Sequence, residues 1–529
     1  MSESNAGQRL RGAGQPMFIL SEDSERTQGK DARSSNISAG KAVAESVRTT
    51  LGPRGMDKML VNDSGDVVIT NDGATILDEM DIEHPAAQML VEVADAQEEE
   101  VGDGTTTAAV LAGQLLSEGE EFLDRDIHPT TIAEGYSHAR DIALDALEDV
   151  VVDDDLSDEI LEAVATASMT GKGTGGVTAE SLASDIVSAV RTVQENGSVN
   201  RGDIQIVARS GESSSATRLV DGVIIDESPI REDMRRSVSD ASIAVVDAGL
   251  ETRETEIDVE FDVQSADQLD AAVESEQREL EEYANALADA GVDVAFVTGD
   301  VADATAVHLA NAGVLAFDSV DDDTVQSIVN ATGARRLPTV DDIEDDDLGA
   351  AESVRLERFG DDEVTFVEGG AKGDSVSLFV RGGTGHSMDE LERAVQDGVD
   401  GTVAALVRGG VVPGAAATEV HLANAVRDAA AGIEGRQQLA VEAFAEALDA
   451  IPRTLAENAG MDPIDGLVDV RAANESDTAG IVVDDGDAVV ADPTDYGVYD
   501  PVAVKREILE SATEAATMIV RIDDVISAE

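Results

Sequence analysis

Residues 101–107 read Val101-Gly102-Asp103-Gly104-Thr105-Thr106-Thr107 and stand between two segments with helical periodicity. Two glycines let a backbone approach a ligand closely, and the start of the following helix presents free N–H groups to an anion. Three threonine hydroxyls can donate to phosphate oxygens, and Asp103 offers a hard oxygen ligand for magnesium. The string is equally typical of a tight turn before an N-capped helix. Taken alone, it predicts a phosphate site and a purely structural turn with equal weight.

The segments around this string predict more than one domain. An apolar stripe with helical spacing ends at Leu51-Gly52-Pro53, a sequence that stops helices. From about residue 213 to 365, short β-like runs alternate with helical patterns, which predicts an inserted α/β domain. Helical periodicity returns from about residue 403. We therefore expect the two helical ends to come together as one domain.

The composition favours a soluble cytoplasmic protein. The 529 residues are too many for a single compact core, and 42% of them are hydrophobic. No segment approaches the roughly 20 consecutive apolar residues of a membrane span, and the first residues lack the apolar stretch of a signal peptide. Cysteine is absent, which excludes disulfides and thiolate metal sites. We expect no membrane partner.

The charge balance indicates a cytoplasm full of salt. The chain has 111 acidic and 36 basic residues, a formal net charge of -75, and the acidic residues are spread along its whole length. Such a surface repels itself in dilute buffer, whereas molar salt shortens the Debye length to about 3 Å. A salt-accumulating halophile explains this composition better than an acidic tail. The same sign of charge disfavours nucleic acid as a partner.

Three further charged residues are candidates for chemistry. Asp72 and Asp397 can act as a carboxylate pair that orients and deprotonates the water attacking a γ-phosphate. The alternatives are a turn carboxylate and a solvated helix residue, because their wide separation in the sequence does not show that they meet. Lys172, on a glycine-flanked loop, is a candidate phosphate contact or an ordinary surface lysine. Its surroundings, Met169-Thr170-Gly171-Lys172-Gly173, are not a Walker A loop.

Taken together, several longer strings resemble the group II chaperonins, which are the archaeal thermosome and its eukaryotic relatives. They occur in the family's order over almost the full length: TTLGPRGMDK (49–58), TNDGATIL (70–77), GDGTT (102–106), RGGT (381–384), IPRTLAENAG (451–460) and RIDD (521–524). With the acidic composition, the chain is identified as a haloarchaeal-type member of this family.

The resemblance implies a chaperonin fold made of nested insertions. An all-α equatorial domain would be formed by both ends of the chain, a small α/β intermediate domain would act as a hinge, and an α/β apical domain would carry a helical lid protrusion. The implied boundaries are 1–148 and 403–529 for the equatorial domain, 149–212 and 366–402 for the intermediate domain, and 213–365 for the apical domain, with the protrusion at about 251–280.

The resemblance also implies the residues of an ATP site. Asp72 and Asp397 match the family's hydrolytic aspartates, and Asp103 its magnesium ligand. Asp500 matches the acidic residue that contacts the ribose, and Lys172 falls on the loop that senses the γ-phosphate. The remaining nucleotide contacts implied in this way are Thr50, Leu51, Gly52, Pro53, Gly104, Thr105, Thr106, Thr107 and Gly414.

The chain departs from the family's pattern near this site. The family's Gly-Gly-Gly-Ala string reads Gly414-Ala415-Ala416-Ala417 here, so two methyl groups add bulk where backbone approaches the nucleotide. The family's Asp-Ala reads Asp397-Gly398, which should cost about 1 kcal/mol of helix stability. These changes indicate a diverged paralogue within a ring of mixed subunits.

The expected function is therefore that of an ATP-dependent protein-folding subunit. ATP binding and hydrolysis, with Mg²⁺ and an expected dependence on K⁺, would close the built-in lid over non-native protein in a double-ring cavity. Homologous subunits would complete the ring. Leu269, Val273 and Leu280 would supply part of an apolar substrate surface, with ordinary packing as the alternative. The alternative function, motivated by the altered glycine string, is a structural ring subunit with weak or no ATP turnover.

Overall fold

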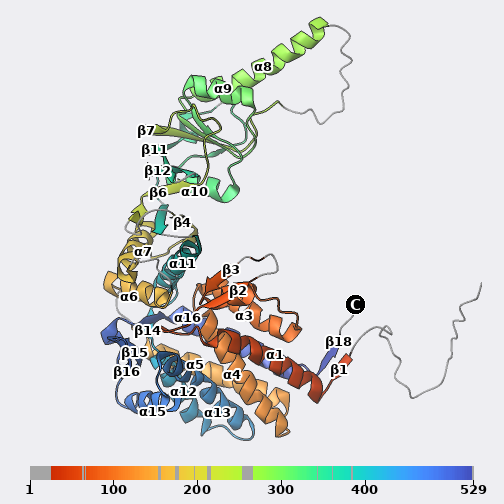
Figure 1. Ribbon diagram of the computed structural model, residues 1–529, viewed down its shortest axis with the longest axis vertical. Coiled ribbons are helices and arrows are strands. Elements are labelled where there is room, and N and C mark those ends of the chain that lie inside the picture. Colours follow the sequence, from red (N-terminus) through yellow and green to blue (C-terminus); the bar gives the residue numbers. More distant parts are fainter. Residues whose placement is uncertain are drawn as a thin grey trace, which may run out of the picture.

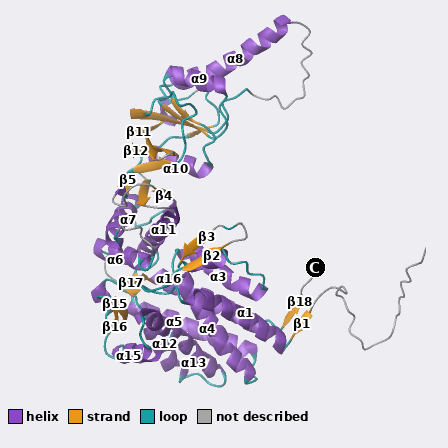
Figure 2. Cartoon of the chain, in the orientation of Figure 1, coloured by secondary structure: helices purple, strands orange, loops and turns teal. Residues whose placement is uncertain are grey.

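The chain forms three bodies that follow one another along the long axis of the molecule (Figure 1). The computed structural model describes residues 26–61, 65, 67–152, 156–172, 178–195, 197–210, 216–252, 266–341, 343–359, 362–373, 375–382 and 385–526. The largest sheet lies in one end body, the middle body combines helices with a small sheet, and the third body is mostly helix with short strand pairs at its edges (Figure 2). The predicted combination of helical and α/β parts is therefore present.

The helical body holds the first and the last described segments of the chain. Its helices are α1 (Lys30–Arg48), α2 (Gly73–Asp78), α3 (Pro85–Val101), α4 (Thr105–Asp124), α5 (Pro129–Leu147), α12 (Ala417–Ala430), α13 (Gln437–Leu448), α14 (Ala450–Ala459), α15 (Pro463–Ala473) and α16 (Val502–Arg521). Strands pair at its edges: β1 (Arg26–Gln28) with β18 (Asp524–Ile526), β2 (Lys58–Val61) with β3 (Val67–Thr70), β14 (Val411–Pro413) with β17 (Tyr499–Pro501), and β15 (Gly480–Asp484) with β16 (Asp487–Ala491).

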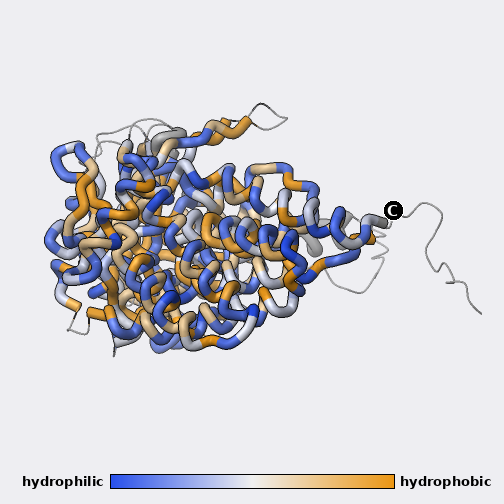
Figure 3. Tube along the Cα trace, turned by 90° about the horizontal axis from the view of Figure 1, so that it is seen from below, coloured by the Kyte–Doolittle hydropathy of each residue, from blue (hydrophilic) through white to orange (hydrophobic). Residues whose placement is uncertain are grey.

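The core of the helical body joins segments from the two ends of the sequence. Helix α16 packs against α3, α4 and α5, and α1 packs against α4. Apolar residues at helical spacing supply this core, for example Leu111 and Leu115 of α4 with Ile519 of α16. Figure 3 shows hydrophobic and hydrophilic residues alternating along the helices seen from below. Neither end of the sequence can therefore complete this core alone.

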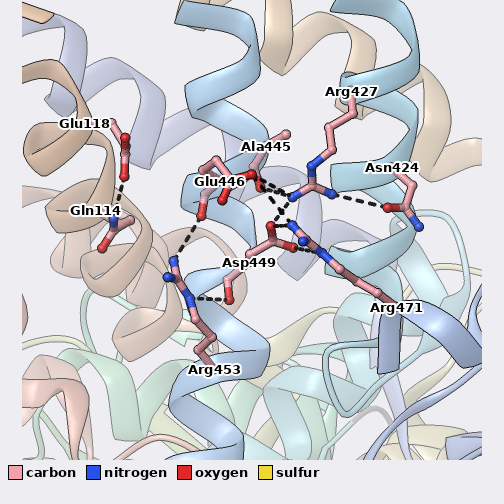
Figure 4. A network of polar contacts seen from close by, with 9 residues as sticks. All are labelled: Gln114, Glu118, Asn424, Arg427, Ala445, Glu446, Asp449, Arg453 and Arg471. Carbon is pink, nitrogen blue, oxygen red and sulfur yellow. Dashed lines mark hydrogen bonds and ion pairs between the residues drawn. The ribbon is translucent and has the colours of Figure 1, made fainter. Parts of the chain in front are cut away.

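An ion cluster around one buried carboxylate ties α12, α13, α14 and α15 together (Figure 4). Asp449, at the junction of α13 and α14, has no exposed surface, and its carboxylate pairs with Arg427 and Arg471. Glu446 lies 3.6 Å from Arg427, and Arg453 donates to the backbone carbonyl of Asp449. Because a buried carboxylate needs a compensating charge, the two arginines fix where these helices meet.

The middle body packs three helices against a small sheet. Its elements are α6 (Asp158–Met169), α7 (Ala179–Val193), α11 (Gly385–Val407), β4 (Ile204–Ser210), β5 (Arg218–Val220) and β13 (Val376–Gly382). Strand β13 lies in the centre, parallel to β4 and antiparallel to β5. Gly398 lets α11 approach its neighbours, because a Cβ there would lie 2.8 Å from Ile186 Cδ1. The helix stability that this glycine is predicted to lose is therefore offset by the close packing that it allows.

The sheet body contains a mixed seven-stranded sheet. Its strand order is β6 (Gly222–Ile225), β12 (Asp362–Gly370), β11 (Gly349–Phe359), β7 (Ser237–Val246), β8 (Val294–Val297) and β9 (Leu315–Phe317), with β10 (Arg336–Leu337) beside β7. Its helices are α8 (Ala266–Asp289), α9 (Asp303–Ala312) and α10 (Asp322–Thr332). Strands β7, β8 and β9 are parallel, as predicted by their alternation with helices, and the segments that pair with one another (243–246, 294–297 and 315–317) are apolar.

The predicted lid protrusion at about 251–280 lies partly outside the described residues, as do the side chains of Leu269 and Val273. Helix α8 projects from the sheet body, and its last turns return to the core (Figure 1). Leu280, Ala284 and Leu287 are buried there. The packing alternative is therefore correct for Leu280, and its assignment to an open substrate surface was wrong.

Judged by strand pairing, the chain passes between the middle body and the sheet body a few residues after the predicted boundaries at 213 and 366. Strand β5 still belongs to the middle sheet, and β12 still belongs to the seven-stranded sheet. Short 3-10 helices lie at Glu148–Val150, Arg201–Asp203, Asp345–Asp347 and Pro493–Tyr496. In the described part of the chain, none of the helices is long and apolar enough to cross a membrane.

Candidate nucleotide site

A cavity with two adjoining parts opens between the helical and middle bodies. The smaller part, about 170 Å³, is lined by polar groups, including Asp72, Lys172 and the threonines that start α4. The larger part, about 500 Å³, has apolar walls that include Ile451, Leu455, Ile481 and Val482. Both parts share the residues Leu51, Gly52, Asp103, Gly104, Thr107, Ala167, Thr170 and Asp500. A polar end joined to an apolar end has the chemistry of a nucleoside polyphosphate.

The N-terminus of α4 forms the floor of the polar part. Gly104, the residue before the helix, has a φ of 86°, and a Cβ there would lie 2.8 Å from Val504 Cγ1. Thr105 and Thr106 are buried, and Thr107 lines both parts of the cavity. No side chain caps this helix end. Its N–H groups therefore face the cavity, as an anion site requires.

Asp103 is held rigidly at the boundary of the two parts. One carboxylate oxygen accepts from the Gly104 N–H at 2.6 Å and the other from the Ser168 hydroxyl at 3.0 Å. Burial raises the pKa of the Asp103 carboxyl above its ordinary value, and Lys172 partly offsets this effect. A divalent cation beside Asp103 would favour its ionised form.

A single carboxylate suits Mg²⁺, which is commonly held by one or two carboxylates together with substrate phosphates. The described residues contain no group of three or more histidine, cysteine, aspartate or glutamate side chains that could hold a metal alone. Asp103 therefore fits a cation shared with a phosphate better than a cation bound by protein alone.

Lys172 brings the two candidate aspartates together. Its ammonium pairs with Asp397 of α11 and lies 3.9 Å from Asp72 Oδ1. Asp72 precedes α2 and accepts from the backbone and the hydroxyl of Thr75, both at 2.8 Å. Asp397 comes from the middle body and is 4% exposed. Despite their separation in the sequence, the two carboxylates thus meet beside the polar part.

The Thr50–Pro53 turn forms one wall of the cavity. The Thr50 hydroxyl lies 3.3 Å from that of Thr106, and Gly52 packs so closely that a Cβ would lie 2.4 Å from Leu455 Cδ2. Asn458, from the string 451–460, donates to the carbonyls of Arg48 and Leu51 at 3.1 and 2.9 Å. The sequence did not predict this role for Asn458, although the string itself was recognised.

Two residues of the altered glycine string, Ala415 and Ala416, line the larger part of the cavity. Gly414 approaches Asp500, because a Cβ at Gly414 would lie 3.2 Å from Asp500 Oδ2. Ala415 and Ala416 have φ values of 54° and 62°, in the left-handed region that favours glycine. Both line the cavity, as predicted from their position in the sequence. The departure therefore adds backbone strain as well as bulk.

Asp500 pairs with Lys505, which in turn pairs with Glu419, and the sequence did not predict either of these two partners. Lys505 Nζ lies 2.7 Å from Asp500 Oδ2 and 2.6 Å from Glu419 Oε1. Burial alone would lower the pKa of Lys505, but the carboxylates of Asp500 and Glu419 outweigh this effect and raise it. The available signal was that only six lysines occur in the chain and that one of them directly follows the apolar residues 502–504.

Glu98 of α3 is a second residue that the sequence did not predict. It lines an acidic chamber of about 440 Å³ with Asp72 and Asp397. Burial, followed by the charge of Asp72, raises the pKa of Glu98 to about 7. A protonatable carboxyl therefore adjoins the aspartate pair.

The sequence matches the TCP-1/cpn60 chaperonin family over residues 43–529. It is 60% identical over 518 residues to thermosome subunit 3 of Haloferax volcanii, which covers 97% of this chain and 99% of that one. It is 50% identical over 520 residues to thermosome subunit alpha of Halobacterium salinarum, which covers 97% and 92%. It is 48% identical over 526 residues to a thermosome subunit of Methanopyrus kandleri, which covers 98% and 96%. The chain therefore belongs to the TCP-1/cpn60 chaperonin family.

Proposed function

We propose that this chain is an ATP-hydrolysing subunit of a group II chaperonin ring that folds other proteins. The observation that carries the proposal is the cluster of Asp72, Lys172 and Asp397 beside a polar cavity that ends at the N-terminus of α4. These groups can bind phosphates and accept a proton from an attacking water.

The roles of the residues follow from this arrangement. The N–H groups and hydroxyls of Thr105, Thr106 and Thr107 bind phosphate oxygens, with the Thr50–Pro53 turn and Ala415 on the other walls. Gly414 packs beside Asp500. Asp103 would hold Mg²⁺, which would neutralise phosphate charge. A terminal phosphate competes with Asp397 for the ammonium of Lys172 and so frees the carboxylate to accept the water's proton. Asp72, already fixed by Thr75, orients the same water.

The two aspartates come from different bodies, which supports a coupling between hydrolysis and movement of the bodies. In this proposal the helical, middle and sheet bodies are the equatorial, intermediate and apical domains. Closure of the middle body onto the nucleotide moves the sheet body and closes the lid near residues 251–280 over non-native protein.

Homologous subunits would complete the double ring. The chain is similar to two different subunits of Haloferax volcanii, thermosome subunits 1 and 3, which supports a ring of mixed subunits. The net charge of -75 supports work in a salt-rich cytoplasm, where K⁺ would screen the surface.

A second candidate function is a structural ring subunit with weak or no ATP turnover. The observation that favours it is the left-handed backbone of Ala415 and Ala416 in the wall of the cavity. It requires that these methyl groups keep the nucleotide from a productive position.

The test is phosphate release from ATP by the assembled chain in molar KCl with Mg²⁺. We expect release by the natural chain, a loss of at least a hundredfold in Asp397→Ala, and no change in Asp469→Ala, which removes an exposed carboxylate on α15. Absence of release from correctly assembled natural chain would reject hydrolysis in favour of the structural role. Equal activity in Asp397→Ala would reject the assignment of this carboxylate.

A further inference from the structure

Lys505 is a buried cation in the wall of the nucleotide cavity. It is 8% exposed and lies between the carboxylates of Asp500 and Glu419, at 2.7 and 2.6 Å. Glu419 is 4% exposed and lies in the first turn of α12, whereas Lys505 lies on α16. Helices α12 and α16 therefore hold Asp500 in place through two successive ion pairs, Glu419 with Lys505 and Lys505 with Asp500.

Such a group is an expensive way to hold a fold together. Removing an ammonium and two carboxylates from water costs several kcal/mol per ion, and apolar residues of similar size often stabilise a core as well or better. All three residues line the larger part of the cavity. Their position favours a role toward a ligand over a role in packing alone.

The position of Asp500 indicates which part of a ligand it meets. It lines both the apolar and the polar part of the cavity. In a nucleotide the sugar lies between the base and the phosphates, so the sugar of a bound nucleotide falls at this boundary. The other carboxylate at the boundary, Asp103, already accepts from Gly104 and Ser168. Asp500 is thus the acceptor placed for a sugar hydroxyl.

Lys505 fixes how that acceptor points. It binds Asp500 at Oδ2, and a carboxylate has a second oxygen that can accept from a hydroxyl. Glu419 holds the ammonium from the other side and so sets its position. Without Lys505 the carboxylate of Asp500, which is partly exposed, would rotate and be solvated.

We propose that Lys505, held by Glu419, is a positioning residue that aims Asp500 at the ribose hydroxyls and makes the site select ribonucleotides over deoxyribonucleotides. The inference rests on the proposed function, because it requires that the cavity binds ATP. It adds a recognition rule for the sugar and assigns Lys505 and Glu419 to it.

The experiment measures equilibrium binding of ATP, 2′-deoxyATP and 3′-deoxyATP to the full assembled chain in molar KCl with Mg²⁺. We expect the natural chain to bind ATP about tenfold or more tightly than at least one deoxy analogue, since a hydrogen bond to a charged group is lost. In Lys505→Met, the affinity for ATP falls while that for the same analogue changes little, so the ratio approaches one.

Matched variants separate positioning from folding. Lys30→Met removes an exposed lysine that pairs with Asp124 at 2.8 Å, and it should leave both affinities unchanged. Lys505→Arg keeps a charge between the two carboxylates and should restore part of the ratio. If Lys505→Met does not assemble, Glu419→Gln serves in its place and should lower the ratio at least threefold.

The outcomes distinguish this inference from the function on which it rests. If the natural chain binds no ATP, the proposed function fails and this inference fails with it. If the natural chain binds ATP and the ratio is the same in the natural chain and in Lys505→Met, the inference alone is overturned. Equal weakening of ATP and both analogues would assign Lys505 a purely structural role and would also overturn it.

Discussion

Replacing Ala415 by glycine should stabilise the chain. Ala415 has a φ of 54° and is only partly buried, so its methyl group contributes little packing and forces a left-handed backbone. That conformation costs an L-residue about 1–2 kcal/mol. Glycine removes this cost but adds about 0.4–1 kcal/mol of freedom to the unfolded chain. The expected net gain in the free energy of unfolding is about 0.5–1 kcal/mol.

Two neighbouring positions give matched controls for this reasoning. Ala416 has a φ of 62° but is 3% exposed, so Ala416→Gly also loses a buried methyl contact worth about 0.8 kcal/mol, and the change should be near zero. Ala417 is 2% exposed and begins α12 without a positive φ. Ala417→Gly should therefore destabilise the chain by about 1–2 kcal/mol.

The assay is thermal unfolding in molar KCl at a fixed chain concentration, because subunit association also affects the midpoint. Ala415→Gly should raise the midpoint by about 0.5–1 °C, Ala416→Gly should leave it unchanged, and Ala417→Gly should lower it. If all three variants lower the midpoint by similar amounts, left-handed strain is not stored in this string, and the reasoning is refuted.

Three further predictions concern buried groups. Between about pH 4.5 and 7 the folded chain keeps a proton on Glu98 that the unfolded chain releases, so the free energy of unfolding falls as the pH rises through this window. Glu98→Gln should make the free energy of unfolding less dependent on pH, by up to about 3 kcal/mol across the window. Denaturant unfolding at a series of pH values measures this difference. Asp449→Asn removes the fully buried charge that pairs with two partly exposed arginines, and should cost about 1–3 kcal/mol in the same assay because Glu446 and solvent still reach those arginines. Glu446→Gln, at a half-exposed side chain, should cost less than about 1 kcal/mol. Gly398→Ala should lower the unfolding midpoint, because the clash with Ile186 outweighs the gain in helix propensity; a higher midpoint would contradict the close packing of α11.

The sequence predicted local structure well where periodicity and turn chemistry act over a few residues. The helix that ends before Leu51-Gly52-Pro53 and the helix after Gly104 both occur at the predicted places. The boundaries at 213 and 366 were less well placed, because strand pairing decides them. Strand β5 belongs to the middle sheet because it pairs with β13, and β12 belongs to the seven-stranded sheet, where one of its partners is β6. Both of these partners lie more than 100 residues away in the sequence.

The candidate site needed information that spacing does not contain. Asp72 and Asp397 meet because α11 returns from an insertion, and only the resemblance indicated that they would. Lys505 and Glu98 were missed, since a buried lysine and a carboxyl with a raised pKa are products of tertiary packing. The bulk of Ala415 was predicted, but its left-handed backbone was visible only in the structure.

The nested order of the three bodies has a consequence for synthesis on the ribosome. The sheet of the sheet body lies within residues 222–370, so this part can fold as soon as that segment has emerged. The middle body must wait for α11, and the helical body for α16, the last helix, which packs against α3, α4 and α5. The apolar faces of α3, α4 and α5 are therefore translated early and covered last. These apolar faces stay uncovered on the nascent chain during most of its translation. We therefore expect this chaperonin subunit to need protection from aggregation during its own synthesis.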